Sequence, residues 1–456
     1  MNFIRKQLHW LTLALIGILI IWVQFNNHYW SNKRILCWDV YGYSQYLSSA
    51  FIYGEVENPK HLLVVDSIYH PTVGVEGYGR HCLDDSCNAS VFKYTMGNAV
   101  MMAPFYLIAH YVTLASKSFP ADGYSEPYQF AVAMSTSFWA IAGLAILILL
   151  LGKWFTPVVT SITTLLIALG TNYFYYASLE SGMTHIPSFI CIVLSILSML
   201  MWLEKKSWRY AFVFGISTGM IALIRLPDLV FGIIPAILFI KTFIDADRSN
   251  RITLLTQAFF ITSLIVIVFL PQMLYWKYVS GSWFYYSYAD EKFYFNNPEI
   301  LAGLFSYKKG WLLYTPIMLF ALAGILLAIK KMPWLGLSIL LFIAVNIYVV
   351  FSWWMWWYGG SFGARCMIQS YAVLAIPLAF VVQWLCDNVS ARNKRKKAMA
   401  ISLSCILLFF FALNLFQTFQ YKRGIIHFDS MTEKSYWAVF GKVKVDGEEW
   451  RKIYSE

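Results

Sequence analysis

Residues 129–151 read QFAVAMSTSFWAIAGLAILILLL and carry no charged side chain. A helix of this length can cross a hydrocarbon core of roughly 30 Å, and similar apolar runs recur along the whole chain. Hydrophobic residues make up 59% of the 456 residues and charged residues only 13%, whereas soluble chains are about 25% charged. Mean hydropathy is +0.57. The sequence therefore predicts an all-α polytopic membrane protein.

The apolar runs predict about eleven transmembrane helices. Two of these runs enclose Arg225-Leu226-Pro227-Asp228, which we interpret as a tight hairpin at the surface, because proline and charges are poorly tolerated at mid-membrane. Residues 1–25 lack a small-x-small cleavage site, so we expect an uncleaved first span. The predicted spans are 8–25, 129–151, 157–177, 185–203, 210–226, 228–240, 252–271, 311–329, 333–351, 367–385 and 398–418.

One apolar run, 94–116, is left out of the spans. It contains Pro104 and His110, and if it crossed, the basic cluster at 392–397 would lie outside, against the positive-inside rule. We therefore expect an interfacial helix on the outer surface. The N-terminus is then inside, and the outer loops are 26–128, 272–310 and 352–366. This gives a transmembrane domain at 1–418 and an outer C-terminal tail at 419–456.

Charge and cysteine content add two expectations. In a membrane protein the net charge of +11 reflects basic residues on the cytoplasmic side, so no nucleic-acid partner is expected. The spans hold almost no acidic residues, which argues against a proton-driven transporter and places any chemistry in the outer loops. Cys82 and Cys87 fall in the first outer loop and are either a disulfide or two free thiols.

Among the acidic residues of the first outer loop, Asp39 has the position best suited to a catalytic carboxylate. It opens a stretch with apolar side chains at 40, 43, 47, 50 and 51, the spacing of a helix. One interpretation is an N-cap. The other is a carboxylate held at the lipid–water boundary as a general base.

Three separate outer loops each place a cation next to a span. They supply Arg225, the pair Lys308 and Lys309, and Arg365. Positive charge on the outer side runs against the usual bias and indicates an anionic partner such as phosphate, which Arg binds through two N–H groups and Lys as a point charge. The alternative is that these side chains are anchors that reach from the span ends to the surface.

A short outer turn, 178–187, holds Glu180 and His185. These two side chains could share a metal ion or a hydroxyl group, although two ligands are too few to define a metal site. A hydrogen-bonded structural histidine is the alternative.

These motifs, in this order, resemble the C-type membrane glycosyltransferases (GT-C fold). The similar branch includes the protein O-mannosyltransferases and the lipid A aminoarabinose transferases. That family usually has a further acidic residue in the second outer loop, where this chain has Glu180 with His185. The motifs are Asp39, Lys93-Tyr94-x-x-Gly97 followed by Pro104, Glu180 with His185, Arg225, Ser306-Tyr307-Lys308-Lys309-Gly310-Trp311 and Ser361-Phe362-Gly363-Ala364-Arg365.

The resemblance implies inverting transfer of one sugar from a polyprenyl-phosphate donor to a lipid, glycan or protein acceptor outside the cytoplasm. The expected setting is a bacterial inner membrane with the active site on the periplasmic side. The resemblance implies no certain cofactor, and a bound divalent metal ion is compatible with it. In the mechanism we expect, Asp39 takes the proton of the acceptor hydroxyl, and fixed cations stabilise the leaving lipid phosphate. The candidate cations are Lys93, Arg225, Lys308, Lys309 and Arg365.

Two other functions are compatible with an outer-face site. An outer-leaflet polysaccharide polymerase or ligase would be expected to rely on Arg and His of a late outer loop instead of an Asp in the first. A lipid-linked sugar flippase or transporter would be expected to show inverted repeats or charges at mid-membrane, and we find neither in the sequence.

Overall fold

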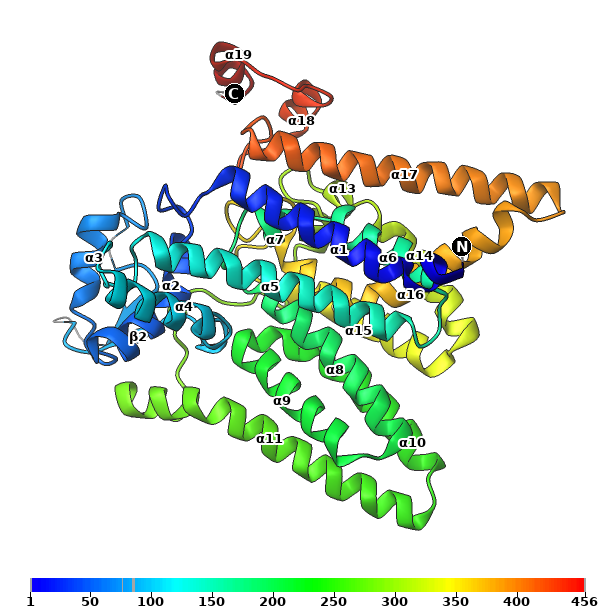
Figure 1. Cartoon of the computed structure of the whole chain (residues 1–456), viewed down its shortest axis with the longest axis horizontal. Helices are drawn as coiled ribbons and strands as arrows, with labels where there is room; N and C mark the ends of the chain where they lie inside the picture. The colour runs from blue at the N-terminus through cyan, green and yellow to red at the C-terminus, as the bar shows by residue number, and fades with distance from the viewer. Residues whose placement is uncertain (1, 76, 84–86, 455–456) are drawn as a thin grey trace.

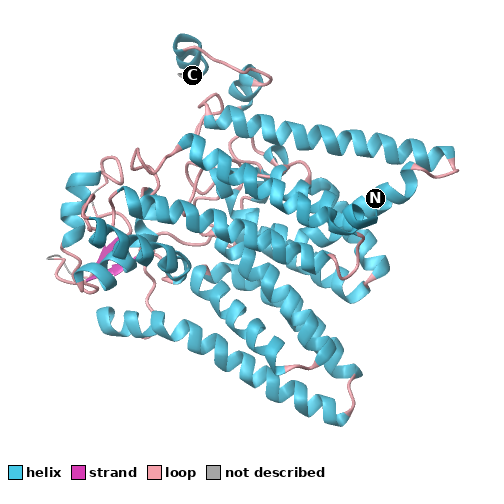
Figure 2. Cartoon of the chain, viewed as in Figure 1, coloured by secondary structure: helices cyan, strands magenta, loops and turns pink. Residues whose placement is uncertain are grey.

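The computed structural model describes residues 2–75, 77–83 and 87–454. This part of the chain is almost entirely helical (Figure 2). Its paired strands are β1 (Arg80–Cys82) and β2 (Ser90–Phe92), which form one antiparallel hairpin in the first outer loop. Cys82 and Cys87 form a disulfide within that hairpin, so the disulfide interpretation is the one that the structure adopts.

Nine helices in the described residues are long and apolar enough to cross a membrane, which confirms an all-α polytopic membrane protein. Two shorter apolar helices, α6 (Pro157–Leu169) and α9 (Trp208–Ile224), join them. The nine are α1 (Asn2–Asn27), α4 (Gly97–Ser116), α5 (Glu126–Leu151), α8 (His185–Lys205), η2 with α10 (Leu226–Gly232 and Ile233–Asp245), α11 (Arg248–Ser280), α15 (Pro333–Val350), η3 with α16 (Arg365–Ser370 and Tyr371–Val389) and α17 (Lys394–Lys422).

The remaining helices are short and lie in the connections between the long ones. They include the elements of the first outer loop and of the C-terminal tail. They are α2 (Trp38–Ser48), η1 (Ser49–Tyr53), α3 (His61–Tyr69), α7 (Tyr173–Ser178), α12 (Ile300–Phe305), α13 (Trp311–Tyr314), α14 (Met318–Lys331), α18 (Glu433–Val439) and α19 (Gly447–Tyr454).

Two predicted spans are broken in the structure. The run 157–177 divides into α6 and α7 around Gly170, Thr171 and Asn172. The run 311–329 divides into α13 and α14 at Thr315-Pro316, where proline removes a backbone donor and disfavours a helical residue before it. The hydropathy averaged over each predicted span does not reveal either break.

The last long helix continues beyond the predicted end of its span. α17 extends to Lys422, four residues beyond the predicted end of the span at 418. Residues of the C-terminal tail hold this extra turn. The side-chain amide of Gln420 donates to the backbone carbonyls of Val439 at 2.8 Å and Lys442 at 2.9 Å.

The elements of the first outer loop gather at one end of the molecule (Figure 1). α1 and α5 run along its length, and α2, α3, α4 and β2 lie at the end away from the N-terminus. α4 is confined to that end, as expected for a helix on the membrane surface; the topology of 94–116 stays a prediction. Gly97 lets α4 touch the end of α9, because a Cβ there would lie 2.3 Å from the carbonyl carbon of Leu223.

The turn at Arg225 reverses the chain, as predicted, but its two helices have different neighbours. Arg225 is extended (φ −153°, ψ 108°) and ends α9. α9 packs between α8 and α11, whereas α10 packs mainly against α15. The end of α9 that leads into Arg225 lies beside the start of α4, because the Ile224 carbonyl accepts a hydrogen bond from Thr95 at 3.3 Å.

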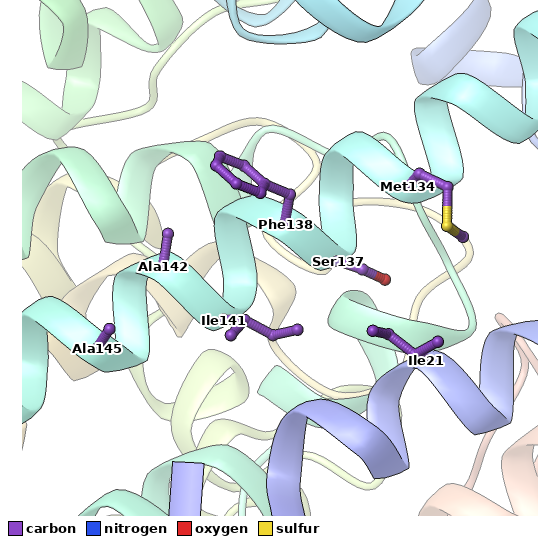
Figure 3. A pocket seen from close by; sticks show the side chains of 7 residues that line it. All are labelled: Ile21, Met134, Ser137, Phe138, Ile141, Ala142 and Ala145. Carbon is purple, nitrogen blue, oxygen red and sulfur yellow. The ribbon is translucent and has the colours of Figure 1, made fainter. Parts of the chain in front are cut away.

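An apolar groove of about 300 Å³ lies between α1 and α5 (Figure 3). Ile21 and Phe138 on its rim are 41% and 50% exposed, so it faces the lipid. None of the candidate site residues lines it. The lining residues are Ile21, Met134, Ser137, Phe138, Ile141, Ala142 and Ala145.

Candidate active site

Asp39 lies in the first turn of α2, and its carboxylate is fully engaged by side chains from elsewhere in the chain. Its Oδ1 accepts hydrogen bonds from the Tyr78 and Tyr94 hydroxyls, each at 2.6 Å. Its Oδ2 accepts from the Arg365 guanidinium at 2.7 Å. The N-cap of α2 is Cys37, so the N-cap interpretation of Asp39 is wrong.

The predicted helical spacing after Asp39 holds for two turns and then fails. Val40, Tyr43 and Leu47 are buried. From Ser49 the chain winds as the π-helix η1, which turns Phe51 outward so that it is 57% exposed. All residues from 40 to 49 are buried, and the exposed positions 50 and 51 follow within the wider winding of η1.

The environment of Asp39 favours its ionised form. Burial alone would raise the pKa of this carboxyl, but the Arg365 charge and the two tyrosine hydroxyls together hold it below its usual value. Asp39 is therefore an anion at neutral pH whose charge is already shared with three donors.

Arg365 links Asp39 to a second carboxylate. One terminal nitrogen donates to Asp39, and the other lies 3.8 Å from the Oε1 of Glu180. The Nε of Arg365 is buried and has no hydrogen-bond partner in the described part of the chain. A guanidinium has five N–H donors, so Arg365 keeps donors for an anionic ligand.

Arg225 and His185 form a second cluster. A terminal nitrogen of Arg225 lies 3.1 Å from the Nδ1 of His185, and because arginine is always protonated, Nδ1 accepts this bond. Gln369 lies on the other side: its Oε1 is 3.3 Å from the same Nδ1, and its amide donates to Asp228 at 2.9 Å. The Arg225 contact fixes His185 in the form with an unprotonated Nδ1, and the Gln369 Oε1 is then a close neighbour of that nitrogen without a hydrogen bond to it.

The two clusters and Lys309 surround a single region. The charges of both Arg225 and Arg365 act on Tyr43 of α2, whose pKa is raised first by its burial. The charges of Arg365 and Lys309 both act on Glu180. Three cations from three loops thus lie around α2 and the 178–187 turn.

The three candidate lysines also have protein partners. Lys309 is 2% exposed and donates to the backbone carbonyls of Ser361 and Phe428, and burial lowers its pKa to about 7. Lys308 lies 3.7 Å from the centre of the Trp357 ring and 4.0 Å from Asp429.

Lys93 is also paired, with Glu291 at 2.6 Å. Its ammonium lies 5.9 Å and 5.7 Å from the ring centres of Tyr78 and Tyr94, the two tyrosines that donate to Asp39. Lys93 therefore connects Glu291, in the loop after α11, to the two tyrosines that donate to Asp39.

Several contacting residues were not predicted from the sequence. Tyr94 lies next to Lys93 in a stretch that was singled out, but nothing in the local pattern marks Tyr78 as a partner of Asp39. Gln369 and Glu291 are equally unremarkable in sequence and act only through the tertiary contacts described above.

The residues present do not fit a divalent metal ion. No group of three or more His, Cys, Asp or Glu side chains in a metal-binding arrangement occurs among the described residues. Glu180 and His185 each face a different arginine, and Asp39 faces Arg365. Each of these side chains already lies beside an arginine cation, which disfavours a metal ion at the same position.

The chain has the fold of solved archaeal oligosaccharyltransferases, which is the all-α polytopic GT-C fold. It is similar to the archaeal oligosaccharyltransferase AglB from Archaeoglobus fulgidus in complex with an inhibitory peptide and a dolichol-phosphate, with a TM-score of 0.57 and 14% identity over 99% of this chain and 60% of that chain. It is also similar to the Archaeoglobus fulgidus oligosaccharyltransferase tethered to an acceptor peptide containing the NVT sequon, with a TM-score of 0.57 and 13% identity over 100% of this chain and 60% of that chain.

The chain thus spans about 60% of the length of these solved structures. No protein-family model and no curated protein matches it. At this level of identity the likeness concerns the fold, and activity has to be argued from the site.

Proposed function

We propose that the protein is an inverting glycosyltransferase that moves a single sugar from a polyprenyl-phosphate donor to a lipid, glycan or protein acceptor. The proposed setting is a bacterial inner membrane, with the site on the periplasmic side. The observation that carries the proposal is the contact at 2.7 Å between Asp39 and Arg365, which are 326 residues apart in sequence, beside a second carboxylate and a second arginine.

The two arginines are the proposed ligands of the donor phosphate. A leaving lipid phosphate gains negative charge as the glycosidic bond breaks, and fixed donors in a site of low dielectric stabilise that charge. Arg365 keeps an unpaired Nε, and Arg225 contacts His185 through one terminal nitrogen and lies 5.9 Å from the centre of the Tyr358 ring. The dolichol-phosphate held by the structurally similar AglB supports a lipid-phosphate ligand.

The lysines take a secondary part in this proposal. Lys93, Lys308 and Lys309 each have a protein partner and would have to release it to touch a phosphate directly. Their charges still contribute to the positive field around the arginines, because Lys309 acts on Glu180 alongside Arg365.

The carboxylates supply the acid–base chemistry. The acceptor hydroxyl attacks the anomeric carbon from the face opposite the phosphate and loses its proton to a carboxylate, a step worth typically 10²–10⁴-fold in rate. Asp39 is the residue that the sequence predicts for this step, and Glu180 is a second carboxylate beside the same arginine.

The lipids of a deletion strain test the proposal. Loss of the protein should cause a polyprenyl-phosphate sugar to accumulate on the outer leaflet, and the wild-type gene should remove it while Arg365→Ala does not. Accumulation on the inner leaflet instead would indicate a flippase. Accumulation of an oligosaccharide on a lipid pyrophosphate would indicate a polymerase or ligase.

A further inference from the structure

The site contains two carboxylates on one arginine, and they differ in how much of their bonding capacity is used. Asp39 already accepts three hydrogen bonds, from Tyr78, Tyr94 and Arg365. A carboxylate has about four acceptor positions, so Asp39 has little room to receive a further proton donor without giving up a present one.

Glu180 has its carboxylate open. Its side chain is 28% exposed, and its contact with Arg365 is a 3.8 Å approach, longer than a hydrogen bond. No other donor in the described residues contacts its carboxylate oxygens. An incoming hydroxyl group can therefore reach Glu180 without displacing a protein partner.

The turn that carries Glu180 is fixed against α2, one residue from Asp39. Gly182 (φ +91°) packs so closely that a Cβ there would lie 2.4 Å from the Cγ1 of Val40. The N–H of Gly182 donates to Thr136 at 2.8 Å, and its carbonyl accepts from Asn98 at 2.8 Å. The two carboxylates are thus held on one rigid frame, as general-base catalysis requires.

The two carboxylates also differ in proton affinity. Burial raises the pKa of Glu180 to about 7, with the charge of Asp39 adding to the rise and Arg365 and Lys309 opposing it. The pKa of Asp39 is lowered. Tyr175, Tyr176 and Tyr421 are the other titratable side chains that interact electrostatically with Glu180. Two carboxyl groups whose environments push their pKa values apart commonly divide acid–base roles between them.

We propose that Glu180, in place of the sequence-predicted Asp39, accepts the proton of the acceptor hydroxyl, and that Asp39 positions Arg365. The acceptor oxygen bonds to the anomeric carbon, and the bond from that carbon to the donor phosphate oxygen breaks. The proton passes to the Glu180 carboxylate, and the lipid phosphate leaves with the bonding electron pair. This assignment rests on the proposed glycosyl transfer.

The pH dependence of kcat/KM separates the two carboxylates. With Glu180 as the base, the wild-type rate should rise with pH and level off above about 7, because only the ionised carboxylate accepts a proton. With Asp39 as the base the rate should already be level well below that pH, since the pKa of Asp39 is lowered.

Variants complete the test, with transfer from a purified polyprenyl-phosphate sugar as the readout. Glu180→Gln should lower kcat at least about 100-fold with donor affinity retained. Glu180→Asp should restore part of the rate, together with an acidic limb, the part of the pH profile in which the rate falls as the pH is lowered. Asp39→Asn should keep an acidic limb, moved to lower pH because the Asp39 charge no longer raises the pKa of Glu180, and should lose kcat/KM mainly through KM. Glu448→Gln, an exposed glutamate in α19, is the matched control.

Two results would overturn the assignment while leaving the proposed function intact. One is a Glu180→Gln rate within tenfold of wild type. The other is loss of the acidic limb in Asp39→Asn but not in Glu180→Asp. Absence of transfer by the wild-type protein with every polyprenyl-phosphate sugar would instead remove the proposed function, and this inference with it.

Discussion

Replacing Arg365 by alanine is the most informative single perturbation of the site. It removes the 2.7 Å bond to Asp39 and the 3.8 Å contact with Glu180. Asp39 is then left buried with two neutral tyrosine donors, so its pKa should rise because the cation that opposes the burial effect is gone.

The magnitude follows from the contacts. A hydrogen bond to a charged group contributes about 1.5–3 kcal/mol, which is roughly ten- to a hundredfold in donor affinity or turnover. Breaking a buried ion pair by removing one partner costs about 3–5 kcal/mol, so the alanine variant should also unfold at a lower temperature. Arg365→Lys should recover part of the donor affinity or turnover and part of the thermal stability, because a lysine can pair with one carboxylate but lacks the planar guanidinium that binds two groups at once.

The assay is equilibrium binding of a labelled short-chain polyprenyl phosphate to purified protein in detergent, together with sugar transfer. Arg423→Ala, which removes an exposed arginine at the start of the tail, serves as the control. If both Arg365 variants stay within twofold of wild type, the side chain is only a surface anchor and the phosphate role is refuted.

Three further predictions concern the tail, the topology and the acid response. Lys309→Met leaves two backbone carbonyls without their buried donor, so limited proteolysis should cleave the C-terminal tail faster than in wild type; equal cleavage would mean that Lys309 does not hold the tail. A cysteine at Ser118 should react with an impermeant maleimide in intact cells if 94–116 stays on the outer surface, and labelling only after permeabilisation would show that it spans. The lowered folded-state pKa of Asp39 gives stability that is present above its unfolded pKa and lost as the pH falls through the folded value, so the melting temperature of wild type should fall with acid more steeply than that of Asp39→Asn.

The membrane architecture could be predicted from the sequence because apolar length and charge bias are local properties. Run length identified most of the spans, and the charge bias placed Arg225 and Arg365 on one side. Breaks at Gly170–Asn172 and at Pro316 were missed, since a span was judged by its average hydropathy. The winding change at Ser49 could not be predicted, because the apolar spacing of an α-helix does not indicate where a π-helix begins.

The sequence predicted several of the site residues but not which of them contact one another. Asp39 and Arg365 were singled out separately, as a base and as a phosphate ligand, and the structure places them in direct contact. Partners such as Tyr78 and the carbonyl of Phe428 depend on tertiary packing, which no local spacing encodes. For the same reason the sequence could not tell that Lys309 is buried against backbone.

A single-turnover experiment tests the central claim most directly. Purified protein is mixed with a polyprenyl-phosphate sugar labelled in the sugar, and the free polyprenyl phosphate and the glycosylated acceptor are measured with time. The two products should appear in equal amounts, with the opposite anomeric configuration to the donor, and about ten- to a hundredfold more slowly in Arg365→Ala. Bound donor that stays intact, or turnover unaffected by Arg365→Ala, would contradict a transferase site built on the pair of Asp39 and Arg365.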